Sequence, residues 1–236
     1  MSQSYGMINK EIFQQIAGGF AVVKGYDRWN IGKIVWEKGV EDTNIKKIQP
    51  SCEQDNKVEK GAATDRLLDE HVLIAEDGTN LHLRIVEKKR RKSYAVLEVQ
   101  GKYQITQFKL TLYLIKSGKQ NADRKVETVA FENHRSITDI GTIKFSNEEV
   151  NQYLAIVKDY NSFHRGENAI VPGLLILQRM LYDLVELFPQ RQPKSVEVIY
   201  RAPLYVNEIC QIVSVGNGAI YGEANQMILW EMRYQL

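Results

Sequence analysis

The chain has 236 residues, of which 44% are hydrophobic and 25% are charged, a balance typical of a soluble globular protein. The length fits one large domain or two small ones, and it is sufficient to bury a core without disulfides or metal ions. The net charge of +2, from 31 basic and 29 acidic residues, gives no reason to expect a nucleic-acid partner.

Neither membrane insertion nor secretion is expected from the sequence. No run approaches the roughly 20 apolar residues of a membrane span. The charged residues Lys10 and Glu11 fall where a signal peptide needs its apolar stretch, so we expect a cytoplasmic protein. Cys52 and Cys210 lie far apart and predict free structural thiols. No zinc site is expected, because the histidines lack the spacing of metal ligands: His71, His82, His134 and His164.

The N-terminal half predicts one helix followed by strands. Residues 8–17 favour a short amphipathic helix closed by Gly18 and Gly19, and residues 31–36 favour a strand. Residues 37–61 are polar and predict a long loop. An antiparallel meander then follows, because alternating segments are separated by short turns, the first of them at Asp77-Gly78. Its expected strands are 71–75, 81–87, 94–99 and 105–115.

A polar stretch at 116–124 is the best candidate for a linker. After it we expect a strand at 140–145 and a helix that begins at Ser146, with Glu149 completing a capping box. A second helix begins near Pro172 and ends before Pro189. Further strands are expected at 195–201, 208–215 and 219–234, the last of which breaks near Asn225.

The second of these helices determines the expected fold. Residues 173–188 are large and apolar except for one narrow polar stripe, whereas a surface helix shows an apolar stripe on a polar cylinder. The helix must therefore be enclosed, and a curled antiparallel sheet around it gives an α+β fold. The pattern Ile-Gly-x-Ile-x-aromatic occurs at 31–36 and again at 140–145, which suggests two fused copies.

A cluster of reactive side chains precedes the enclosed helix. Asp159, Asn161 and His164 fall in a turn between two helices, where a carboxylate and an imidazole can share one water molecule and transfer protons. Gly173 opens the helix, and its N–H is a candidate donor to an oxyanion. Taken alone, Asp159 also suits a turn and His164 suits a partly buried, backbone-bonded histidine.

The segment from Phe145 to Val213 resembles the MaoC-like acyl dehydratases, the (R)-specific enoyl-CoA hydratases of the hot-dog fold. Their motif is Asp-x-Asn-Pro-hydrophobic-His, then Ala and a Gly-led buried helix. This chain has Asp159, Asn161, His164, Ala169 and Gly173 in that order. The block YRAPLYVNEI at 200–209 is similar to the later strand of the family, Arg/Lys-Phe-x-x-Pro-Val-x-x-Gly-Asp/Glu, with Pro203 and Glu208 in matching places.

Three residues depart from the family motif. Ser162 replaces the usual Pro, Lys158 stands where a Gly precedes the Asp, and Pro172 stands where a His is usual. A Pro-Gly pair before a buried helix is also similar to the β-hydroxyacyl-carrier-protein dehydratases, which share the fold.

The resemblance implies an α+β double hot-dog, with antiparallel sheets each curled round a central helix. Residues 1–120 would form a degenerate N-terminal hot-dog, and residues 121–236 a C-terminal one carrying the site. The implied enzyme is a hydro-lyase of fatty acid metabolism that reversibly hydrates 2-enoyl thioesters to (R)-3-hydroxyacyl thioesters, on coenzyme A or acyl carrier protein. Asp159 and His164 would be catalytic, Asn161 and Gly173 would bind substrate, and no cofactor would be needed.

Other functions remain open at this point. The departures at Lys158, Ser162 and Pro172 also fit a non-catalytic acyl-thioester-binding protein, and an Asp near a buried helix fits an acyl-CoA thioesterase. The basic run 88–92 predicts a solvated hairpin tip, with contact to coenzyme A phosphates as the alternative. A homodimer is compatible with the fold, although no residue argues for it.

Overall fold

A computed structural model describes residues 8–21, 23, 25–26, 29–39, 65–75, 77–116, 137–183, 193–215 and 219–236. Their helices are α1 (Lys10–Ala21), α2 (Asn147–Val157) and α3 (Gly173–Gln178), with a 3₁₀ turn at Ser162–His164 and a π-helical turn at Arg179–Asp183. Their strands are β1 (Trp29–Lys38), β2 (Arg66–Ile74), β3 (Asn80–Arg90), β4 (Tyr94–Tyr103), β5 (Thr106–Lys116), β6 (Ile137–Ile143), β7 (Ser195–Tyr200), β8 (Cys210–Val215), β9 (Ala219–Ala224) and β10 (Met227–Gln235).

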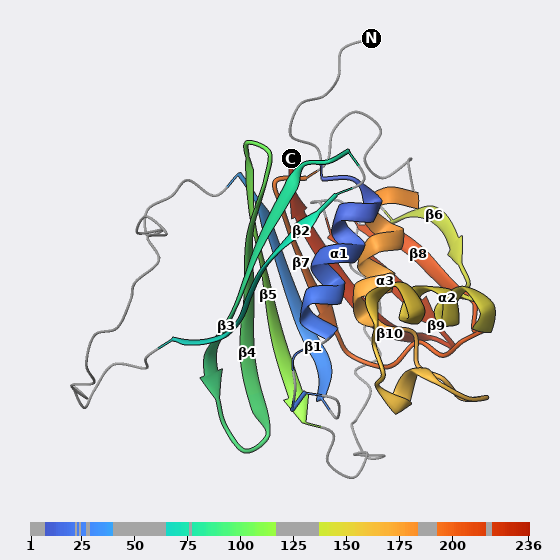
Figure 1. The fold of residues 1–236 in the computed structure, drawn as a ribbon. Coiled ribbons are helices and arrows are strands. Elements are labelled where there is room, and N and C mark those ends of the chain that lie inside the picture. The colour runs from blue at the N-terminus through green and yellow to red at the C-terminus, as the bar shows by residue number, and fades with distance from the viewer. Residues whose placement is uncertain are drawn as a thin grey trace, which may run out of the picture.

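The strands form one antiparallel sheet in the order β2-β3-β4-β5-β1-β7-β10-β9-β8-β6. The two halves of the chain meet where β1 pairs with β7, from Lys33 opposite Ile199 to Glu37 opposite Ser195. Figure 1 shows the helices gathered on one side of the curled sheet. The predicted α+β double hot-dog is therefore correct, and its two sheets are continuous.

Each half contributes a helix with buried apolar side chains. In the N-terminal half α1 buries Ile12, Phe13 and Ile16 and contacts β3 and β4. In the C-terminal half the side chains of α3 are buried from Leu174 to Gln178. The apolar faces of the helices and the sheet thus share one core, as expected for a layered α+β fold.

The strand order has an approximate symmetry about the β1–β7 seam. Outward from the seam, one half reads β1-β5-β4-β3-β2 and the other reads β7-β10-β9-β8-β6. The outermost strands differ, because β6 precedes the helices of its half whereas β2 follows β1. The repeated Ile-Gly-x-Ile-x-aromatic pattern does not fall on equivalent strands. Its first copy, 31–36, lies in the central strand β1, whereas 140–143 of its second copy lies in the outermost strand β6.

The predicted end of α1 was wrong. Helix α1 does not end at Gly18 and Gly19 but continues to Ala21. Gly18 lies where α1 contacts α2, and a Cβ there would lie 3.5 Å from the Val157 backbone, an ordinary contact distance. The predicted break of the strand 219–234 near Asn225 is confirmed, because this segment is a hairpin of β9 and β10 turned at Asn225 and Gln226 with φ of 51° and 64°.

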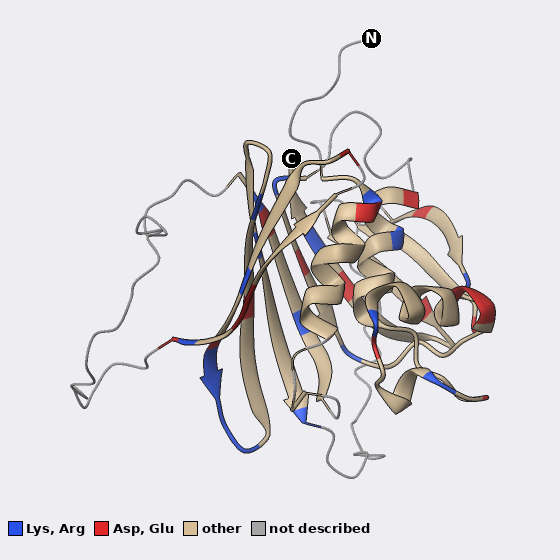
Figure 2. Cartoon of the chain, viewed as in Figure 1, with Lys and Arg blue, Asp and Glu red and all other residues tan. Residues whose placement is uncertain are grey.

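Several predictions fall on residues that the structure does not describe, including most of the 37–61 loop, nearly all of the 116–124 linker, the boundary at 120/121, His134 and Cys52. Cys210 is buried, and burial raises the pKa of its thiol to about 12. Figure 2 shows basic residues gathered at the end of the β3–β4 hairpin, where the run 88–92 lies. Among the described residues no helix is both long and apolar enough to cross a membrane.

Candidate functional site

The candidate site residues follow directly after helix α2. It begins as the capping box predicts, with the Ser146 hydroxyl accepting the Glu149 N–H at 3.1 Å. It ends at Lys158, which has a left-handed backbone with φ of 55°, and the Lys158 N–H donates to Leu154 O. This left-handed residue turns the chain away from the helix axis, and Asp159 is the next residue.

The loop after α2 is fixed by its own side chains. Asp159 Oδ1 accepts the Asn161 N–H at 2.9 Å, which forms an Asx turn. Asn161 Oδ1 accepts the Phe163 N–H at 3.2 Å and caps the 3₁₀ turn that carries His164. Asn161 is buried, so its visible function is to shape the loop. A contact between Asn161 and substrate stays a prediction.

The structure brings the side chains of Asp159 and His164 together. His164 Nε2 lies 3.8 Å from Asp159 Oδ2, and the two side chains are 13% and 24% exposed. His164 Nδ1 lies 2.7 Å from the main-chain oxygen of Ile170. Because a carbonyl oxygen can only accept, Nδ1 carries a proton, and in the neutral ring Nε2 is left as the basic nitrogen. The basic nitrogen therefore faces the carboxylate, at a distance longer than a direct hydrogen bond.

Gly173 begins α3, as predicted. As the first residue of the helix it has an N–H without an acceptor in the preceding turn. The Tyr200 hydroxyl, from β7, donates to Gly173 O at 2.6 Å. A Cβ on Gly173 would lie 3.0 to 3.3 Å from atoms of the Tyr200 phenol group, so a larger residue would crowd this contact. Gly173 thus has a steric reason for being glycine besides any catalytic one.

Two tyrosines near the site were not found from the sequence. Tyr153 is buried on α2, and burial together with the Asp159 carboxylate raises its pKa. Burial and Tyr153 raise the pKa of Tyr200 well above its ordinary value. Tyr153 falls on the apolar face of α2, with Val150, Leu154 and Val157, so its spacing indicates a core residue. Tyr200 stands at the aromatic position of the block at 200–209, but that position alone does not indicate a contact with Gly173.

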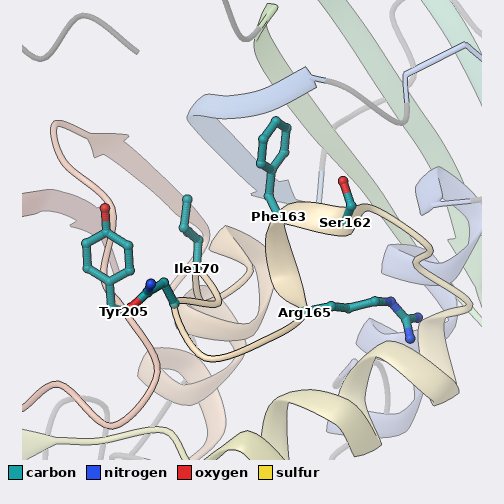
Figure 3. Close-up of a pocket in the computed structure, with 6 residues that line it drawn as sticks. Ser162, Phe163, Arg165, Ile170 and Tyr205 are labelled. Carbon is teal, nitrogen blue, oxygen red and sulfur yellow. The ribbon is translucent and has the colours of Figure 1, made fainter. Parts of the chain in front are cut away.

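An open pocket of about 490 Å³ lies beside the His164 loop (Figure 3). It is lined by Ser162, Phe163, Arg165, Asn168, Ile170 and Tyr205. Asp159 and His164 are not in its lining, although Arg165 Nη2 also donates to the main-chain oxygen of Asp159 at 3.2 Å. The pocket is therefore lined by the sequence neighbours of His164 and not by the Asp159–His164 pair itself. Within the described ranges, no group of three or more His, Cys, Asp or Glu side chains is placed to hold a metal ion.

Comparisons with known proteins identify the fold. No protein-family model and no curated protein sequence matches this chain. Among solved structures, the peroxisomal multifunctional enzyme type 2 from Drosophila melanogaster matches with a TM-score of 0.53 and 10% identity over 95% of this chain. An acyl-ACP thioesterase from Bacteroides thetaiotaomicron matches with a TM-score of 0.52 and 9% identity, over 99% of this chain and 91% of its own.

A MaoC-like dehydratase from Phytophthora capsici matches with a TM-score of 0.47 and 14% identity, over 89% of this chain and 70% of its own. This chain spans only 40% of the length of the Drosophila enzyme. At these identities the matches to the Drosophila enzyme and to the acyl-ACP thioesterase, both with TM-scores above 0.5, show the hot-dog fold alone. They do not assign an activity to this chain.

Proposed function

We propose that this protein reversibly hydrates 2-enoyl thioesters to (R)-3-hydroxyacyl thioesters. The observation that carries the proposal is the Asp159–His164 pair, in which the Nδ1 bond to Ile170 O turns the basic Nε2 toward the carboxylate. The motif around this pair resembles that of the MaoC-like hydratases, and the fold is one that acyl-thioester enzymes use. We also propose that the protein acts in the cytoplasm, in fatty acid metabolism, and that its reaction needs no cofactor.

The chemistry follows from the two side chains. A water held between them loses a proton to His164 Nε2 while its oxygen bonds to C3 of the substrate. The C2=C3 electron pair moves toward the thioester carbonyl. The proton on His164 passes through a water molecule to the Asp159 carboxylate, because the 3.8 Å between the two atoms exceeds hydrogen-bond distance. The Asp159 carboxyl group then delivers this proton to C2, which restores the pair. Dehydration is the same sequence in reverse.

Negative charge develops on the thioester oxygen in this reaction. The Gly173 N–H, at the start of α3, is our proposed donor to that oxygen. The open pocket beside the loop would admit the polar end of the thioester, since the residues on both sides of His164 line it. Asn161 would hold Asp159 and His164 at their spacing through the two turns that it joins.

The test is the hydration of crotonyl-CoA by purified wild-type protein and by Asp159→Asn and His164→Ala. Removal of either group should lower kcat by about 100- to 10,000-fold, because each transfers a proton in the reaction. Asp139→Asn and His82→Ala are matched controls on exposed strand positions, and they should keep wild-type rates. Wild-type rates in Asp159→Asn and His164→Ala would exclude these residues from the mechanism.

The same assay separates the alternatives. Asp159 near the start of a buried helix also suits attack by water on the thioester carbonyl, which would release free thiol from acyl-CoA. Thiol release that depends on Asp159 would identify a thioesterase instead of a hydratase. Thermal stabilisation by acyl-CoA without any turnover would identify a binding protein.

A further inference from the structure

Tyr153 holds a hydroxyl group that has no hydrogen-bond partner among the described residues. The residue is 4% exposed, and its hydroxyl oxygen is buried. Buried polar groups in native proteins are nearly always hydrogen-bonded, because an unpaired one destabilises the fold. The Tyr153 hydroxyl is therefore a candidate hydrogen-bond donor to a bound molecule.

Tyr153 lies close to the candidate site. The Asp159 N–H donates to Leu154 O at 3.0 Å, which holds Asp159 against the end of α2, and Tyr153 is the residue before Leu154. The Asp159 carboxylate acts on the Tyr153 phenol, and Tyr153 in turn acts on Tyr200. The Tyr200 hydroxyl is already used, since it donates to Gly173 O at 2.6 Å. Tyr153 is thus a neighbour of Asp159 and of the tyrosine that is bonded to the first residue of α3.

The state of the phenol suits a donor. Burial and the nearby carboxylate raise the pKa of Tyr153 far above neutrality, so the group keeps its proton throughout the working range. A neutral O–H in a buried, water-poor setting makes a strong hydrogen bond to an oxygen that gains negative charge. Such a donor needs no reorganisation at the moment of reaction.

We propose that the Tyr153 hydroxyl donates a hydrogen bond to the carbonyl oxygen of the bound thioester, together with the Gly173 N–H. This inference rests on the proposed function, because it assumes that an acyl thioester occupies the site. Tyr153 keeps its own proton in every step. It stabilises the charge on the carbonyl oxygen while the proton transfers remain with Asp159 and His164.

Tyr153→Phe is a sharp test because it removes the O–H and nothing else. No hydrogen bond to a described residue is lost, so the melting temperature should stay at the wild-type value or rise. The kcat/KM for crotonyl-CoA should fall by about 10- to 100-fold, the effect of removing one donor to the oxyanion. Tyr94→Phe, on β4 in the other half of the sheet, is the matched control and should keep wild-type activity.

A binding measurement tests the contact without turnover. Two unreactive thioether analogues of acyl-CoA are compared. One keeps a carbonyl group, as a ketone, at the position of the thioester carbonyl, and the other has a methylene group at that position. Wild-type protein should bind the ketone analogue more tightly, and Tyr153→Phe should lose most of that preference. Its affinity for the methylene analogue should not change.

The outcomes separate this inference from the proposed function. A wild-type enzyme that hydrates crotonyl-CoA, with Tyr153→Phe equally active, would overturn the inference and leave the function standing. A lowered melting temperature in Tyr153→Phe with an unchanged preference for the ketone would also overturn it, since the hydroxyl would then be structural. If wild-type protein neither hydrates the thioester nor binds either analogue, both proposals fail together.

Discussion

At the scale of single residues, the backbone of Lys158 explains one departure from the dehydratase motif. The motif has glycine before the Asp, and Lys158 adopts φ of 55° at this place. Left-handed backbone is strained for residues with a Cβ and nearly free of strain for glycine. The motif glycine therefore has a conformational reason, and a lysine can occupy the position at a modest cost in stability.

Lys158→Gly should consequently stabilise the protein. We expect the free energy of unfolding in urea to rise by about 0.5–1 kcal/mol, because the relief of the left-handed strain outweighs the added freedom of the unfolded chain. Lys102→Gly, at an exposed position within β4, has no such strain to relieve and should lower the free energy of unfolding. A loss of stability in Lys158→Gly would show that the lysine side chain makes a compensating contact.

Local sequence was sufficient for the part of the site that is itself local. Asp159, Asn161 and His164 lie within one loop, and the Asx turn and the 3₁₀ cap that join them are encoded in neighbouring residues. The two tyrosines were missed for a different reason. Tyr153 and Tyr200 come from α2 and β7, and only the tertiary fold brings them near Asp159 and Gly173.

At the scale of elements, the pairing of β9 with β10 depends on Gly222, because a larger residue there would collide with a side chain of β10. Gly222 pairs with Trp230 across the two strands, and a Cβ on Gly222 would overlap the indole ring. Trp230 is almost completely buried, and close-packed interiors leave little space for a ring to move. The glycine in this strand thus marks a side chain lying over the backbone, not a turn.

Gly222→Ala should therefore lower the free energy of unfolding by about 1–3 kcal/mol, the usual effect of overpacking a core. Gly18→Ala is the opposite case, because the new Cβ would lie 3.5 Å from the Val157 backbone at ordinary contact distance. In that helix interior alanine should raise stability by about 0.5–1 kcal/mol. Urea unfolding followed by circular dichroism measures both changes, and equal effects of the two variants would contradict the packing argument.

The success of the element predictions depended on how local their signals are. The capping box at Ser146 and the turn at Asp77-Gly78 are short-range, and both are present. The end of α1 was placed wrongly because a pair of glycines can mark either the end of a helix or a close contact between two helices. The sequence offers no means of distinguishing these meanings, since the contact is with α2, far along the chain.

At the scale of the whole molecule, the two halves are not independent units. Strands β1 and β7 pair directly, and α1 also reaches across to the C-terminal half. Lys10 Nζ lies 2.8 Å from Asp183 Oδ1, and the rings of Phe13 and Tyr182 lie 5.8 Å apart. Sequence periodicity predicts strands but not which strands pair over long separations, so the continuous sheet and the placement of β2 at its edge could not be foreseen.

Because the two halves share the β1–β7 seam, we expect a destabilising substitution in one half to lower the stability of the other half as well. Leu97 is fully buried in β4, away from the seam, and Leu97→Ala should cost about 2–5 kcal/mol. If the sheet unfolds as one unit, the slowest-exchanging amides of β10 should lose the same protection free energy as those of β4. Hydrogen exchange followed by mass spectrometry measures both strands in one sample. Unchanged protection of β10 would mean that the C-terminal half, with Asp159 and His164, holds its structure without the support of the first.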